Sequence, residues 1–385
     1  MRFPRLPLVS SLAVLSVVVM APGPAPAASG LTVVMSGLDN PRGLAMDTHG
    51  TLYVAEAGKG GAGQPGPPEC APTGRAAPED VACAGRTGAV SRLRHGVQER
   101  IVTGLPSAAP QALGGQVATG PHDVSLHGSG GIYVTLGLGG GPAYRDALGE
   151  DLGWLIKVNE KKHTWQKIAD VATYEFDANP SGGAPDSNPY GLLARAGGRV
   201  LTDAGGNSLL RVWDNGAIST LATFPSRAQG RSTDAVPTSV AVGPDGAYYV
   251  GELTGVPFAT GAARVYRVVP GQAPQVFLEG FTTIIDLTFG PDGSLYVLQH
   301  SSFGPFFAGP GSLVRVAPDG TRMTVLGGLT RPTSVLVTGG EGKDDDDGED
   351  DEHGVGASGK KAPLAFYISN RGTSPGIGEV IRFEP

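Results

Sequence analysis

The sequence predicts an all-β fold, a β-propeller made of six blades with four strands each. The first observation is composition, since a chain of 385 residues with 61 glycines and 32 prolines has few stretches suited to helices. The second is a pattern of short apolar runs separated by Gly, Pro, Asn and Asp, which is typical of strands joined by turns. The third is that one unit of these runs recurs six times along the chain.

The repeated unit begins with a proline and continues through a first apolar strand, a glycine turn and a second strand with a Tyr-Val pair. A loop, an alternating third strand with a basic residue, a turn and a last strand follow. The first copy contains Pro41–Met46, Gly50–Glu56, Gly88–Leu93 and Glu99–Val102. Because each unit supplies four short strands, we interpret it as one propeller blade.

The later copies keep this order. They begin at Pro121, Pro189, Pro237, Ile285 (where the proline is missing) and Pro332. Copy six ends with its third strand, Glu379–Phe383, and therefore lacks a fourth. We expect the run Leu31–Met35, which precedes copy one, to supply that strand and to close the ring without an unpaired edge.

Propeller topology places the connections between second and third strands, and those between blades, on one side, here called the loop-rich rim. The predicted long loops of this rim are 58–87, 104–120, 137–151, 173–188, 254–262 and 301–311. The opposite rim carries tight turns, except for the acidic run Glu341–Glu352 within loop 339–362. We expect this run to be solvated and disordered, because an EF-type calcium loop would place Lys343 where Asp is required.

The N-terminal residues have the features of an export signal. Arg2 and Arg5 precede a mostly apolar run over residues 8–20, and Ala25-Pro26-Ala27 offers a cleavage site. The run is too short for a membrane anchor. We therefore expect a signal peptide over 1–27, a single secreted propeller over 28–385, and no membrane span after cleavage.

Charge and cysteine content narrow the class of protein further. The formal net charge of −7 comes almost entirely from the acidic run, so the remaining chain is near neutral and has no basic stripe for nucleic acid. The two cysteines, Cys70 and Cys83, lie in the insertion 58–87. In an exported protein this pair predicts a disulfide that pins one long loop.

Polar residues should gather around the axis at the loop-rich rim. They follow the repeat prolines or end the second strands, and a funnel lined in this way is a plausible ligand site. The candidate ligand-binding residues are Arg42, Glu56, His122, Tyr190, Asp203, Glu252 and Asp286. For the acids that end second strands, Glu56, Asp203 and Glu252, a structural role remains open, since such acids often accept hydrogen bonds from loop backbone.

The recurring Pro-x-Gly-Leu and Gly-x-Leu-Tyr-Val-Ala-Glu segments resemble those of NHL and gluconolactonase-like six-bladed propellers. The segments Gly37–Ala45 and Leu52–Gly58, with the Gly/Pro-rich cysteine insertion, most resemble the ScyD/ScyE family over essentially the whole mature chain. The namesakes of that family are exported proteins associated with the synthesis of a cyanobacterial sunscreen pigment. The resemblance implies fold and export more than a particular chemistry.

The lactonase and esterase relatives hold a divalent metal with Glu, Asn and Asp near the starts of the innermost strands. The matching positions here contain neither an acid nor an amide: Arg42, His122, Tyr190, Thr238, Ile284 or Ile285, and Thr333. A divalent metal is thus possible, but its usual ligands are not matched. The cofactor stays unknown, and no complete catalytic motif is present.

Two hypotheses of function follow. The first is a non-catalytic binding or scaffold propeller, a monomer that captures a small molecule or an extracellular partner at the loop-rich rim. The alternative is a lactonase or esterase-like hydrolase, or a quinone-dependent sugar dehydrogenase, with an atypical axial site. In that alternative His122 would act as the base, Asp123 or Asp286 as its partner, and Arg42 would stabilise an oxyanion.

Overall fold

The computed structural model describes residues 30–63, 69–72, 81–128, 131–229, 231–304, 307–340 and 362–385. The predicted signal peptide 1–27, the acidic run Glu341–Glu352 and parts of the insertion 58–87 lie outside these residues. None of the described helices is long and apolar enough to cross a membrane.

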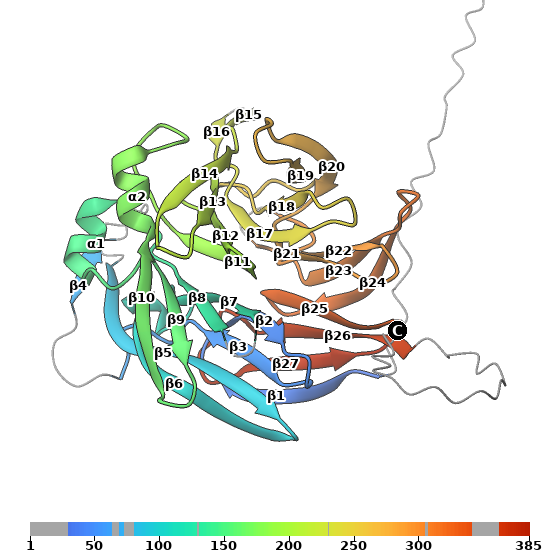
Figure 1. Cartoon of the computed structure of the whole chain (residues 1–385), viewed down its shortest axis with the longest axis horizontal. Helices are drawn as coiled ribbons and strands as arrows, with labels where there is room; N and C mark the ends of the chain where they lie inside the picture. Colours follow the sequence, from blue (N-terminus) through green and yellow to red (C-terminus); the bar gives the residue numbers. More distant parts are fainter. Residues whose placement is uncertain are drawn as a thin grey trace, which may run out of the picture.

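The described chain forms six antiparallel sheets that follow one another around a central axis (Figure 1). The first contains β2 (Pro41–Met46), β3 (Leu52–Glu56), β5 (Val81–Arg94), β6 (Val97–Pro110) and the short β4 (Cys70–Pro72). The second contains β7 (Pro121–His127), β8 (Gly131–Leu136), β9 (Trp154–Asn159) and β10 (Thr164–Asp170). The third contains β11 (Pro189–Arg195), β12 (Gly198–Asp203), β13 (Ser208–Val212) and β14 (Ile218–Thr223).

The remaining three sheets have four strands each. The fourth contains β17 (Pro237–Val242), β18 (Tyr248–Glu252), β19 (Ala263–Val268) and β20 (Gln275–Phe281). The fifth contains β21 (Ile284–Phe289), β22 (Leu295–Gln299), β23 (Gly311–Val316) and β24 (Arg322–Leu329). The sixth contains β25 (Ser334–Gly340), β26 (Ala362–Asn370), β27 (Gly378–Phe383) and β1 (Thr32–Leu38). Six sheets agree with the six repeats of the sequence.

Apolar side chains fill the spaces between neighbouring sheets. The second strands are buried along their whole length, as in β3, β18 and β22, because each lies inside its sheet and is covered on both faces. Tyr296 of the fifth sheet, for example, packs edge-on against Phe366 of the sixth, with ring centroids 4.9 Å apart. The two faces of each sheet can be buried only against other sheets. The stability of every sheet therefore depends on its neighbours.

The first strands of successive sheets form the innermost layer. Each first strand contacts the next one around the axis, in the order β2, β7, β11, β17, β21 and β25. The last of these, β25, contacts β2 again. Polar side chains join these strands across the sheet boundaries. The carboxylate of Asp123 accepts a hydrogen bond from the backbone N–H of Leu192 at 2.7 Å, and that of Asp286 accepts one from Val335 at 2.9 Å.

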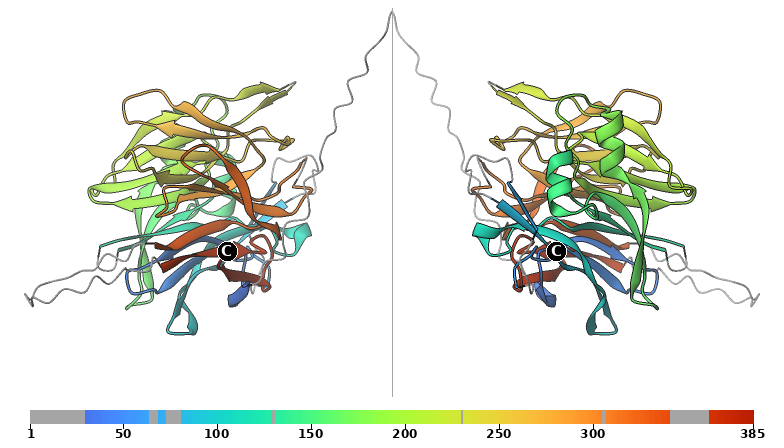
Figure 2. Two further views of the ribbon diagram at one scale, coloured as in Figure 1. Left: turned by 90° about the vertical axis from the view of Figure 1, so that its right-hand side faces the viewer. Right: turned by 90° about the vertical axis from the view of Figure 1, so that its left-hand side faces the viewer.

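The N-terminal strand β1 lies beside β27 in the sixth sheet, blue beside red in Figures 1 and 2. The two strands pair antiparallel, with Val33 opposite Ile381 and Met35 opposite Val380. Met35 and Leu38 are buried in a cluster that also contains residues of the first sheet. Segments from the two ends of the described chain therefore complete one four-stranded sheet.

The first sheet differs most from the sequence prediction. We expected loops over 58–87 and 104–120, but β5 and β6 extend far into both and pair from Ala82 opposite Pro110 to Arg94 opposite Val97. The predicted disulfide is confirmed, since Cys70 of β4 is bonded to Cys83 of β5.

Short elements occupy several of the other predicted loops. They are η1 (Gln111–Leu113) within 104–120, α1 (Pro142–Leu148) within 137–151 and α2 (Val171–Ala178), which overlaps the start of 173–188. A hairpin of β15 (Arg227–Gln229) and β16 (Arg231–Thr233) lies between β14 and β17, where no long loop was predicted.

Candidate functional site

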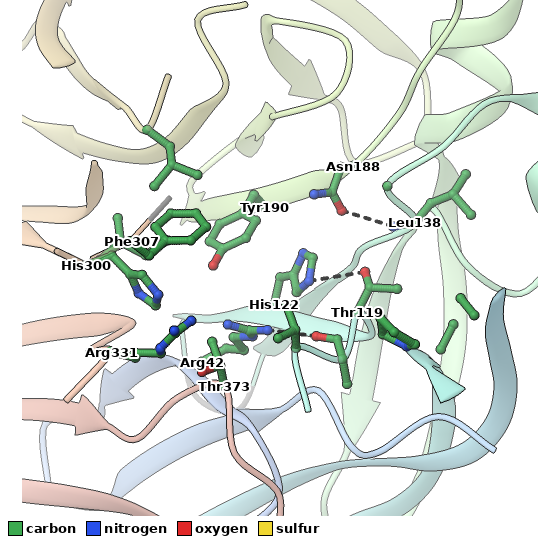
Figure 3. A pocket seen from close by; sticks show the side chains of 18 of the residues that line it. Arg42, Thr119, His122, Leu138, Asn188, Tyr190, His300, Phe307, Arg331 and Thr373 are labelled. Carbon is green, nitrogen blue, oxygen red and sulfur yellow. Dashed lines mark hydrogen bonds between the residues drawn. The ribbon is translucent and has the colours of Figure 1, made fainter. Parts of the chain in front are cut away.

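A cavity of about 200 Å³ lies at the axis on the loop-rich rim (Figure 3). All six sheets, or the connections that follow their strands, contribute to its wall. The polar and aromatic part of the wall consists of Arg42, Thr119, His122, Tyr144, Asn188, Tyr190, His300, Phe307, Arg331 and Thr373. Small apolar residues, among them Ala82, Ala108 and Ala118, line another part. The extended β5–β6 hairpin brings Ala82 and Ala108 to the cavity.

Arg42 is a buried cation in this wall, with only 6% of the residue exposed. It follows Pro41 at the start of β2, and one guanidinium nitrogen donates to the carbonyl oxygen of Ala118 at 2.7 Å. Its Nε has no hydrogen-bond partner among the described residues. Arg42 also makes no ion pair with any described carboxylate, although a buried charge is costly unless it is compensated.

His122 follows Pro121 on β7 and is neutral. Burial, followed by the charge of Arg42, lowers its pKa to about 3. Its Nδ1 lies 3.1 Å from the carbonyl oxygen of Pro189, which can only accept, so Nδ1 carries the hydrogen. Nε2 is then an acceptor for the hydroxyl of Thr119 at 3.2 Å. The ring stacks on Tyr190 with centroids 4.5 Å apart.

His300 is the second neutral imidazole at the cavity. Its Nδ1 lies 2.8 Å from the carbonyl oxygen of Pro332, and burial lowers its pKa to about 4. Nε2 of His300 has no hydrogen-bond partner within the described part of the chain, and so remains available as an acceptor. The ring meets Phe307 edge-on at 5.1 Å.

Tyr190 and Arg331 complete the polar wall. Burial raises the pKa of the Tyr190 hydroxyl, which therefore stays protonated. In Figure 3 this hydroxyl faces the same space as Arg42, Arg331 and His300. Arg331 is exposed on the connection before β25 and forms no ion pair within the described ranges.

Asp123 and Asp286 lie one residue farther along the innermost strands than the cavity wall. Asp123 accepts from the backbone of Val124 and Leu192, and Asp286 accepts from Leu287, Val335 and the hydroxyl of Ser334. Desolvation raises the pKa of Asp286 to about 6, and desolvation, followed by the charge of Asp286, raises that of Asp123 well above its usual value. Neither lines the cavity.

The proposed His122–Asp pair is therefore not formed, because both carboxylates are held by the backbone of neighbouring sheets and both nitrogens of His122 have other partners. The catalytic alternative loses the base and partner arrangement on which it depended.

The acids that end second strands point away from the cavity. Glu56 binds Arg100 through both carboxylate oxygens, at 2.9 and 2.7 Å, and Asp203 accepts from the backbone of Asn188, Gly205 and Gly206. Glu252 pairs with Arg227. Only Asp203 accepts from the backbone of the loop after its own strand, as the structural alternative expected. Glu56 accepts from the backbone of Asp39, in the connection before β2, and Arg227, the partner of Glu252, lies in the β15–β16 hairpin.

Sequence reasoning found Arg42, His122 and Tyr190 but missed the other seven polar and aromatic residues of the wall: Thr119, Tyr144, Asn188, His300, Phe307, Arg331 and Thr373. His300 directly follows Gln299, which ends its second strand, and Arg331 directly precedes the repeat proline Pro332. The repeat therefore contained a signal for both: His300 lies one position after the end of a second strand, and Arg331 lies two positions before the residue that follows the proline. Phe307 lies in the connection between β22 and β23, where the sequence analysis chose no candidate.

Comparison with solved structures shows the fold. An assigned oxidoreductase (glucose dehydrogenase) from Thermus thermophilus matches with a TM-score of 0.52 and 17% identity, over 91% of this chain and 98% of that one. A Xanthomonas campestris gluconolactonase matches with 0.50 and 10%, over 92% and 89%. Virginiamycin B lyase from Staphylococcus aureus matches with 0.47 and 12%, over 93% and 98%. This chain has a β-propeller fold.

Neither a family profile nor a curated protein sequence matches the chain. The structural likenesses, all at low identity, therefore carry no assignment of chemistry.

A divalent metal of the lactonase type does not fit the residues around the cavity. Hard cations prefer several oxygen ligands that include carboxylates. The described wall instead presents two arginines and two imidazoles, one of which is already bonded at both nitrogens. The nearest acids, Asp123 and Asp286, have backbone partners. We derive no chemical step through a metal at this site.

Proposed function

We propose that the protein is an exported propeller of ScyD/ScyE type that binds a small ligand or partner group at the axial cavity without turning it over. One observation carries this proposal: residues from all six sheets converge on one cavity, and they bring hydrogen-bonding groups without a base–acid pair. A site built in this way can hold and orient a ligand, and its described residues do not form the base–acid pair that the hydrolytic alternative would need.

Two further elements of the proposal concern the whole chain. Export is supported by the signal-like N-terminal sequence and by the Cys70–Cys83 disulfide, a bond favoured in oxidising compartments. We also propose that the pairing of β1 with β27 is what closes the ring of sheets, in agreement with its antiparallel register.

The test is a thermal-shift screen of a small-molecule library on the protein without residues 1–27, with hits measured by calorimetry. We expect ligands that bind wild type and fail to bind Val117→Trp, because Val117 lies in the cavity wall and is 39% exposed, so an indole there fills the entrance. The matched control is Val97→Trp on the opposite rim, where Val97 is 63% exposed; it should bind normally.

Turnover is measured on the same preparation with lactones and aryl esters, with and without added divalent metal. Hydrolysis that Val117→Trp abolishes would replace the binding function by an enzymatic one. Ligand binding that both tryptophan variants retain would place the site elsewhere on the molecule.

A further inference from the structure

We propose that the axial cavity is selective for small organic acids: the ligand carboxylate binds between Arg42 and Arg331, and a flat apolar part faces Phe307 and the small apolar residues of the wall. This inference rests on the proposed function, because it names the ligand class of the same cavity.

The first argument is the charge of the wall. Arg42 and Arg331 both line the cavity, and neither has a carboxylate partner within the described residues. This differs from other arginines of the protein, for example Arg100 and Arg227, which pair with Glu56 and Glu252. A bound carboxylate would supply the counter-charge that both guanidinium groups lack among the described residues.

The second argument is that the neighbouring titratable groups leave this positive charge in place. His122 and His300 are neutral and contribute no charge. Asp123 and Asp286 are the nearest acids, and both are occupied by N–H and O–H donors of adjacent strands. Desolvation, followed by the charge of Asp286, raises the pKa of Asp123 well above its usual value.

The third argument concerns the remaining ligand surface. Phe307, supported by Phe258 at a ring-centroid distance of 4.2 Å, forms a flat aromatic wall. Ala82, Ala108 and Ala118 form a shallow apolar wall that a ring or short chain can cover. A cavity of about 200 Å³ limits the ligand to a small molecule.

The experiment uses acids and their uncharged amides of matched shape: benzoate with benzamide, cyclohexanecarboxylate with its amide, and hexanoate with hexanamide. Calorimetry on the protein without residues 1–27 should show at least one acid binding about ten-fold or more tightly than its amide. Added salt should weaken acid binding, because the cationic wall is partly exposed.

Arg331→Gln should reduce acid binding by about ten-fold and reduce amide binding by much less, because only the acid loses an ionic contact. Arg331 is exposed, so this variant should fold even if Arg42→Gln, which loses a buried contact, does not. Arg94→Gln is the control, since it removes the same charge from an exposed position at the opposite rim.

Amides that bind as tightly as acids, or acid binding that is unchanged in Arg331→Gln, would overturn the inference. Library hits that Val117→Trp excludes would show in that case that the cavity still binds ligands, so the proposed function would stand. If neither the acids, the amides nor the library bind wild type, both proposals are wrong.

Discussion

Arg42, His122 and Tyr190 occupy one position in three successive repeats, directly after the proline, and this is why the sequence located them. The acids Glu56, Asp203 and Glu252 also share a position, but neighbouring strand residues point to opposite sides. The repeat alone could not determine which of two adjacent residues faces the axis. The acids contact neighbouring connections instead. The cavity is lined by the residue directly after the second strand in two sheets, Leu253 after Glu252 and His300 after Gln299.

Glu175 on α2 is a buried acid that the repeat pattern did not single out. It is 1% exposed, and its Oε2 has no hydrogen-bond partner within the described chain. A Cβ added to Gly206 would lie 2.4 Å from Oε2 and 3.2 Å from the carboxyl carbon of Asp203, so the two carboxyl groups flank the same glycine. Desolvation, then Asp203 and Asp186, raise the pKa of Glu175 to about 8.

We predict that Glu175→Gln stabilises the protein in a pH-dependent way. From pH 4.5, the ordinary pKa of Glu, the unfolded state loses its proton while the folded state keeps it, so wild-type stability falls until about pH 8. The variant lacks this loss. Its Tm should exceed that of wild type by roughly 2 °C or more at pH 8, with a smaller difference at pH 4.5.

Glu150→Gln, at an exposed position, is the control and should show no such trend. An equal Tm difference for Glu175→Gln at both pH values would mean that the gain comes from a new hydrogen bond and not from the missing ionisation.

At the scale of elements, the first strands were predictable because proline, apolar residues and a glycine turn recur in five of the six copies. The extended ends of β5 and β6 were not, because residues 81–87 and 104–110 are rich in Ala, Gly and Pro and show no alternation of large apolar side chains. Pairing with each other and with β4 supplies the order that local sequence lacks. These extensions carry part of the cavity wall, so that part could not be predicted either.

The innermost strands approach so closely that one of them requires glycine. A Cβ on Gly43 of β2 would lie 1.8 Å from Oδ1 and 2.6 Å from Cα of Asp123 on β7. We predict that Gly43→Ala costs about 1–3 kcal/mol or more in the free energy of unfolding, because backbone must move. Denaturant titration measures this cost.

Gly327→Ala in β24 is the matched substitution, since an added Cβ there meets nothing within 4 Å. It should leave the free energy of unfolding nearly unchanged. Equal effects of the two alanines would mean that β2 and β7 are farther apart than described.

At the scale of the whole molecule, six repeats in sequence correspond to six sheets in space, and the contacts of the innermost strands return from β25 to β2. The repeat made this arrangement predictable, because a single sheet cannot bury its own two faces. In a closed ring, every sheet buries both faces against its neighbours. The chemistry of the axis was less predictable, because it depends on which residues happen to stand at equivalent positions in six divergent copies.

We predict that removing Leu31–Met35 from the chain destabilises the protein and causes it to associate. The deletion removes most of β1, exposes the backbone edge of β27 and removes the buried Met35. Removing only Ser29 and Gly30 should have little effect. Light scattering and thermal melts compare the two variants, and a longer deletion that stays monomeric with an unchanged Tm would contradict the proposed closure.

The pairing of β1 with β27 also sets an order in time. Val33 can pair only after Ile381, nearly the whole length of the chain away, has been synthesised. The first strand of the described chain is therefore the last to pair. Contacts between such distant residues slow folding and leave strand edges open meanwhile. During synthesis, five sheets can form while the sixth is still incomplete, and the cavity lacks Arg331 and Thr373 of its wall until the last part of the chain has been made.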